Sequence, residues 1–270
     1  MLSRLLFAGL AGLLVSCSSA PSESAVPPIH MEVTGSGEPT VVLIHGNGAS
    51  SAAWEPVAPA IGDLGVRLVN LDRPGLGQSP LGPRPYRIDD EADALEAGLA
   101  AQKVSGPVIL VAHSYGGLLA FLLADDIEDL RGIVLVDAVI PGEITAEQIE
   151  ETFSVYRPQY EAVREKSPAL AEAVIPVVEA MPETAERTEG ITLPAGTPVI
   201  TIKAPEGYDL SEEMNAKILA WHRQFVAQDP AHRKLIIAEG SGHQVMADRP
   251  DVVIEAVETL VETTRDPARP

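Results

Sequence analysis

Ser114 stands in a sequence context that could make its hydroxyl a nucleophile. The segment Ala112-His113-Ser114-Tyr115-Gly116-Gly117 directly follows the apolar run 108–111. Small residues two positions before and two positions after a serine permit a sharp turn from a strand into a helix, which exposes the hydroxyl. Ala112 takes the first of these positions, where glycine is more usual. Because a free hydroxyl is a weak nucleophile at neutral pH, this chemistry needs a positioned base.

His243 is the histidine whose position best suits that base. It ends the glycine-rich segment Gly240-Ser241-Gly242-His243, which follows the last apolar run of the chain. Ligands and catalytic groups gather at the carboxyl ends of strands in open α/β sheets. We interpret four other histidines as surface, packing or loop-bracing residues: His30, His45, His222 and His232.

Two backbone N–H groups are candidates for stabilising the oxyanion that forms when serine attacks an acyl carbon. Such an anion needs preorganised donors. The apolar run 41–44 leads into the turn His45-Gly46-Asn47-Gly48, and Tyr115 follows the serine. We predict that Asn47 and Tyr115 supply these donors.

The elements that must position these groups alternate between short apolar runs and longer helical patterns. Runs rich in Val, Ile and Leu, apolar on both faces, are typical of parallel strands covered by helices. They occupy 40–44, 67–71, 107–112, 132–136, 198–202 and 234–238, while helical periodicity occupies 52–64, 88–102, 115–124 and 251–263. This order predicts an α/β fold with a doubly wound, mostly parallel sheet. An antiparallel first strand is expected near 29–33.

Residues 143–193 interrupt the alternation with acidic, amphipathic sequence that contains four prolines. The segment is too long for an ordinary loop of a compact domain. We predict an inserted helical cap at about 141–195, over the active-site end of the sheet. A flexible linker is the competing interpretation.

The overall composition favours one globular domain. The chain has 270 residues, 46% of them hydrophobic, and a formal net charge of −20. That charge would repel phosphate backbones, so no nucleic-acid partner is expected. The sequence also shows no metal-ligand cluster, phosphate loop or dinucleotide fingerprint, and no cofactor or metal is expected.

The N-terminal residues predict export. Arg4 precedes the apolar run 5–15, and Leu14-Val15-Ser16-Cys17 resembles the lipobox of bacterial lipoproteins, whose cysteine is acylated. Cys17 is the only cysteine, and a buried core thiol is its alternative role. We expect residues 1–16 to be a signal peptide, 17–28 a flexible tether and 29–270 the folded domain. The resemblance implies an exported lipoprotein, anchored to a cell-envelope membrane by a lipid such as palmitate on Cys17.

Taken together, the motifs resemble those of α/β-hydrolase fold enzymes over nearly the whole chain, from about 33 to 260. In chain order they are 43–48, 72–79, the turn at Ser114, 134–137 and 240–243. The resemblance implies the α/β-hydrolase fold. It also implies that Asp72 and Arg73 brace loops rather than react.

The resemblance leaves two places for the acid that would orient His243. Many relatives carry it after the next-to-last strand, where Glu206 and Asp209 stand, although the segment 203–209 departs from the usual pattern. A second placement follows the strand after the nucleophile helix, where Asp137 stands in a segment that resembles the haloalkane-dehalogenase branch. We favour Asp137. Either choice keeps the chain order serine, acid, histidine.

A serine at the sharp turn sets the expected chemistry. Dehalogenases and epoxide hydrolases of this fold resemble the chain in layout but carry an aspartate at that position. Ser114 implies acyl transfer through a covalent acyl-enzyme. We expect a carboxylesterase-like serine hydrolase acting on a small-molecule ester. The alternatives are an amidase or aminopeptidase of the proline-iminopeptidase type, and a non-catalytic binding protein on the same scaffold.

Overall fold

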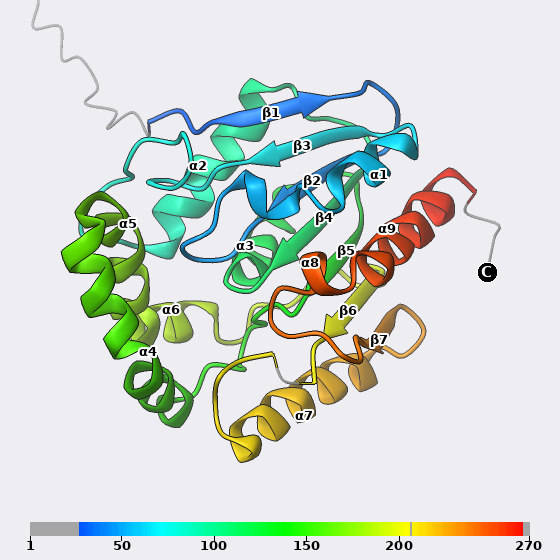
Figure 1. The fold of residues 1–270 in the computed structure, drawn as a ribbon. Helices are drawn as coiled ribbons and strands as arrows, with labels where there is room; N and C mark the ends of the chain where they lie inside the picture. Colours follow the sequence, from blue (N-terminus) through cyan, green and yellow to red (C-terminus); the bar gives the residue numbers. More distant parts are fainter. Residues whose placement is uncertain (1–26, 206, 267–270) are drawn as a thin grey trace, which may run out of the picture.

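A seven-stranded sheet forms the centre of the computed structural model, which describes residues 27–205 and 207–266 (Figure 1). The strands are β1 (Met31–Thr34), β2 (Thr40–Ile44), β3 (Arg67–Leu71), β4 (Val108–His113), β5 (Leu130–Val136), β6 (Val199–Lys203) and β7 (Arg233–Ile237). Their spatial order is β1-β3-β2-β4-β5-β6-β7. Only the β1–β3 pair is antiparallel among these strands. The predicted α/β fold with a mostly parallel sheet and an antiparallel first strand is confirmed.

Helices cover both faces of the sheet. Side chains of α1 (Ala58–Asp63), α8 (Val245–Asp248) and α9 (Pro250–Arg265) pack on one face, and side chains of α2 (Ile88–Ala101), α3 (Gly116–Leu123) and α7 (Glu212–Gln228) pack on the other. The single helix predicted over 52–64 is instead a 3₁₀ turn, η1 (Ser51–Trp54), followed by α1. Pro56 explains the interruption, because proline lacks an N–H donor and clashes with the preceding helical turn.

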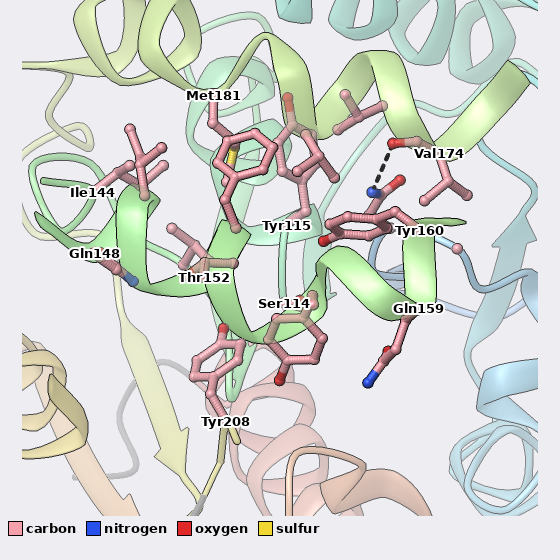
Figure 2. A pocket seen from close by; sticks show the side chains of 18 of the residues that line it. Ser114, Tyr115, Ile144, Gln148, Thr152, Gln159, Tyr160, Val174, Met181 and Tyr208 are labelled. Carbon is pink, nitrogen blue, oxygen red and sulfur yellow. Dashed lines mark hydrogen bonds between the residues drawn. The ribbon is translucent and has the colours of Figure 1, made fainter. Parts of the chain in front are cut away.

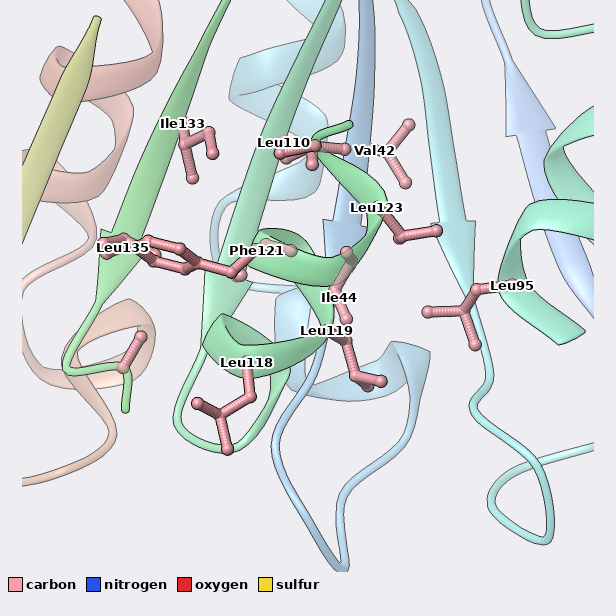
Figure 3. Close-up of a cluster of buried hydrophobic side chains, with 14 of the residues drawn as sticks. Val42, Ile44, Leu95, Leu110, Leu118, Leu119, Phe121, Leu123, Ile133 and Leu135 are labelled. Carbon is pink, nitrogen blue, oxygen red and sulfur yellow. The ribbon is translucent and has the colours of Figure 1, made fainter. Parts of the chain in front are cut away.

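The helix that follows Ser114 is buried on nearly all sides. Leu118 and Leu119 of α3 are fully buried and belong to the same apolar cluster as Leu110 of β4 and Leu135 of β5 (Figure 3). Close-packed interiors resist displacement of their side chains. The turn at Ser114 is therefore attached to one of the most constrained parts of the molecule.

Three helices lie between β5 and β6: α4 (Ala146–Lys166), α5 (Pro168–Glu179) and α6 (Met181–Thr188). The Thr145 hydroxyl caps α4 by accepting a hydrogen bond of 3.2 Å from the N–H of Gln148. Proline also begins α5, where its missing N–H removes no helical hydrogen bond. Figure 1 shows these helices grouped beyond the ends toward which β4 and β5 point.

The predicted signal peptide, Cys17 and most of the predicted tether lie outside the described residues. Within the described part of the chain, no helix combines the length and apolarity needed to cross a membrane.

Candidate active site

Ser114 occupies a strained turn between β4 and α3. Its φ is +53°, a left-handed conformation that is uncommon for residues other than glycine. The glycines that follow it allow close approach of neighbouring backbone: a Cβ on Gly116 would lie 2.7 Å from the carbonyl oxygen of Ile44, and one on Gly117 would overlap the carbonyl oxygen of Val139. Strain of this kind is characteristic of a serine held for nucleophilic attack.

His243 and Asp137 form a short contact beside this turn. The Nδ1 atom of His243 lies 2.6 Å from Oδ2 of Asp137. Asp137 directly follows β5, has a φ of +40° and is fully buried. His243 follows β7 on the glycine-rich loop and is partly exposed. The structure thus brings together the predicted base and the favoured acid from two separate loops.

Of the two alternative acids, only Asp209 is described by the structure, and it does not make this contact. Asp209 is exposed and donates its backbone N–H to the Tyr156 hydroxyl at 3.2 Å. Glu206 lies outside the described residues.

Asp137 has a second partner, the charged side chain of Lys203, which sequence reasoning missed. Its Nζ lies 2.6 Å from Oδ1 of Asp137, and both side chains are buried. Burial opposes ionisation of Asp137, but the ion pair with Lys203 and the hydrogen bond with His243 outweigh it, so the pKa of Asp137 lies well below its ordinary value. A lysine that ends an otherwise uncharged buried strand, Val-Ile-Thr-Ile-Lys, was the available signal.

The imidazole of His243 lies between two other rings. The ring centroid of Tyr208 is 4.4 Å away and that of His113 is 4.5 Å away. The Tyr208 hydroxyl donates to the carbonyl oxygen of Asp137 at 3.3 Å and interacts with the side chain of Ser114. His113 Nε2 donates to the carbonyl oxygen of His243 at 2.9 Å. Sequence reasoning identified neither ring, because their contacts form only between distant segments.

Burial determines the protonation of both flanking rings. Burial and the neighbouring His243 lower the pKa of His113 to about 3, so this imidazole is neutral near pH 7. Burial and the charge of Asp137 raise the pKa of Tyr208 well above its ordinary value, so the phenol keeps its proton and acts as a hydrogen-bond donor.

Ser114 and His243 face the same cavity, but no hydrogen bond joins their side chains in the region described. Free enzymes often hold such pairs loosely, and the hydrogen bond tightens only when substrate is bound.

The two predicted oxyanion residues adjoin Ser114. A Cβ on Gly46, the residue before Asn47, would lie 2.8 Å from the Cβ of Ser114. Asn47 and Tyr115 line the same cavity as Ser114. Neither backbone N–H is used in a hydrogen bond within the described chain. Both donors therefore remain available to a developing oxyanion.

A buried polar network supports this side of the site. Arg73 contacts both carboxylate oxygens of Glu91 at 2.6 and 3.0 Å, Glu91 accepts from the Tyr86 hydroxyl at 2.6 Å, and that hydroxyl lies 2.6 Å from the hydroxyl of Tyr115. His45 accepts from the backbone N–H of Arg73 at 3.1 Å, and burial followed by the charge of Arg73 lowers its pKa to about 4. These contacts fit the bracing roles expected for His45 and Arg73.

A cavity of about 360 Å³ opens above Ser114 and is lined largely by α4, α5 and α6. Figure 2 shows Ser114 and Tyr208 on the opposite side of this space from Val174 and Met181. Among the described residues, none of those lining it is Asp, Glu, Lys or Arg. Most of its surface is apolar, with contributions from Val139, Ile149, Phe153, Val174, Val178 and Met181. The site therefore suits an uncharged, largely apolar ligand.

Gly207 offers a test of the acid that does not require a substitution of Asp137 itself. A Cβ at Gly207 would overlap the carboxylate of Asp137. We expect Gly207→Ala to displace the carboxylate from His243 and to lower kcat/KM by about 10²-fold, since misplacement of a catalytic group by about 1 Å has effects of that size. The matched control is Gly62→Ala, because nothing lies within 4 Å of a Cβ there. Equal activity of both variants would contradict the predicted role of Asp137.

The sequence model of the Alpha/beta hydrolase family matches residues 41–256, well over half of the chain. The chain belongs to this family. A haloalkane dehalogenase of Sphingobium indicum is 35% identical over 133 residues, which cover 46% of this α/β hydrolase and 44% of the dehalogenase. The matched segment thus covers less than half of the dehalogenase and less than half of this chain.

Solved structures of esterases share the fold over most of its length. A carboxylesterase of Nitrososphaera gargenis superimposes with a TM-score of 0.68 at 16% identity, covering 92% of this chain and 98% of that one. A thermophilic esterase of Thermogutta terrifontis gives a TM-score of 0.63 at 19% identity, covering 87% and 93%. At these identities the similarity shows the fold alone.

Proposed function

We propose that this α/β hydrolase is a serine esterase that acts through a covalent acyl-enzyme on Ser114. The observation that supports the proposal most strongly is the contact of 2.6 Å between His243 and Asp137, which lies beside a serine in a strained turn. In this proposal His243 accepts the serine proton as the hydroxyl attacks the ester carbonyl. The N–H groups of Asn47 and Tyr115 then stabilise the oxyanion.

The identity of the nucleophile favours acyl transfer over dehalogenation, although the relative described above is a haloalkane dehalogenase. Displacement of a halide by Ser114 would leave an alkyl ether on the serine, and water activated by His243 does not cleave an ether. An acyl-enzyme is an ester, which the same water hydrolyses. Acyl transfer is therefore a reaction class that allows this serine to turn over, whereas dehalogenation is not.

The cavity supports an uncharged ester with an apolar acyl chain as substrate. A carboxylate or ammonium in the cavity would lose its hydration without a charged partner on the described walls, which is costly. Burial of an apolar acyl chain against α4 and α5 would lower the free energy of the bound state.

Covalent labelling tests the proposal. The purified full chain is treated with a fluorophosphonate probe and separately with p-nitrophenyl butyrate. We expect one probe per chain, attached to the peptide that contains Ser114, together with release of nitrophenol. A folded chain that neither labels nor releases nitrophenol would favour a binding role, and cleavage of a proline amide in preference to the ester would favour the amidase alternative.

We also propose that the chain is a lipoprotein anchored through Cys17, on the basis of the lipobox-like segment 14–17. Growth of a bacterial expression strain with an alkyne-tagged palmitate analogue should label the wild-type chain in the membrane fraction. Cys17→Ser should lose the label and leave that fraction. Equal labelling of both chains would refute the anchor.

A further inference from the structure

The last residue of β6 supplies a cation to the candidate triad. Lys203 is the last residue of β6, and its buried Nζ contacts Oδ1 of Asp137, while His243 contacts Oδ2 of the same carboxylate. The carboxylate therefore has one side-chain partner on each oxygen. Ala204 adds a backbone N–H at 3.2 Å from Oδ1.

We propose that Lys203 is a positioning residue that fixes the orientation of Asp137 and extends the activity of the enzyme to lower pH. This inference rests on the proposed serine mechanism, in which neutral His243 is the base. A fully buried lysine is rare unless it is paired, so the Lys203–Asp137 contact defines a single arrangement for both side chains. The carboxylate cannot rotate away from His243 without leaving the ammonium unpaired.

The charges around His243 determine the direction of the pH effect. A carboxylate stabilises a protonated base beside it, and a protonated base cannot accept the serine proton. The ammonium of Lys203 offsets part of the carboxylate charge and favours the neutral imidazole. Activity is therefore expected to persist to lower pH with Lys203 than without it.

Other titratable groups near this cluster do not supply the same charge. Tyr208, whose ring lies 5.3 Å from Lys203 Nζ, stays protonated, and His113 beyond His243 is neutral near pH 7. Thr201 lies on the same face of β6 as Lys203 and contacts His222 of α7, which pairs with Glu143 at 3.1 Å. Glu143 thus has His222 as its partner, and Lys203 is the cation in contact with Asp137.

The pH dependence of kcat/KM for p-nitrophenyl butyrate tests this role in the full chain. Lys203→Met removes the charge and leaves an unbranched apolar side chain that is one atom shorter. We expect the acid limb of its profile to move up by about one pH unit, since charges within about 4–6 Å shift titrations by about 1–3 units. Lys203→Arg keeps the charge and should retain the wild-type acid limb. Lys234→Met is the matched control, because Lys234 is an exposed lysine of the neighbouring strand β7.

The outcomes separate this inference from the proposed function. If wild-type chain labels with fluorophosphonate but Lys203→Met shows the wild-type acid limb, the role of Lys203 is refuted and the esterase remains. If the wild type does not label, the proposed function itself fails. Thermal unfolding of each variant shows whether it is folded at the assay temperature. Should Lys203→Met be unfolded there, Lys203→Gln, which retains a polar end, provides the same comparison.

Discussion

Replacing Ser114 by alanine is expected to abolish fluorophosphonate labelling and to lower ester hydrolysis by on the order of 10³–10⁶-fold. His243→Ala should lose a similar amount, because a serine without its base reverts to a weak nucleophile. The double variant should be little worse than either single variant, since the two residues act as one unit. The measurement is kcat/KM for p-nitrophenyl butyrate, together with the initial rate of labelling.

Two exposed residues of the same types provide controls. Ser105 lies in the loop before β4, and His232 is an exposed residue before β7. Ser105→Ala and His232→Ala should keep wild-type rates. Labelling that survives in Ser114→Ala would place the nucleophile elsewhere and would overturn the proposed mechanism.

The parts of the fold that sequence reasoning predicted are those with a local signal. Continuous apolar runs predict buried parallel strands because both faces of such strands are covered, and β2 and β3 fall at the predicted residues. The turn at Ser114 was also local, because it depends on small neighbours within three residues. The predicted positions of β4 to β7 differ from the observed ones by one or two residues at their ends, where patterns are least informative.

The groups that sequence reasoning missed depend on contacts between distant segments. Lys203 contacts a residue 66 positions earlier in the chain, and Tyr208 contacts a ring from the loop after β7. A lysine or a tyrosine has no pattern that reveals such a partner. The cavity was unpredictable for the same reason, since its shape depends on how α4 and α5 pack against each other above Ser114.

The choice of acid gives the second large effect. Asp137→Asn should lower kcat/KM by about 10³–10⁴-fold, because an amide no longer holds the productive tautomer of His243 or stabilises its imidazolium. Asp209→Asn and Glu206→Gln should remain within about threefold of wild type. Asp209 is exposed and its backbone, not its carboxylate, contacts Tyr156. A large loss in either alternative variant, with Asp137→Asn active, would reassign the acid.

Loss of folding could imitate this result, because Asp137→Asn would leave the ammonium of Lys203 buried without its partner. Breaking a buried pair costs about 3–5 kcal/mol. The double variant Asp137→Asn/Lys203→Met removes both charges and should regain much of that stability, measured by thermal unfolding. If the large loss of kcat/KM persists in the stabilised double variant, the loss belongs to catalysis. If activity returns with stability, Asp137 serves the fold, and the base must be oriented by another group.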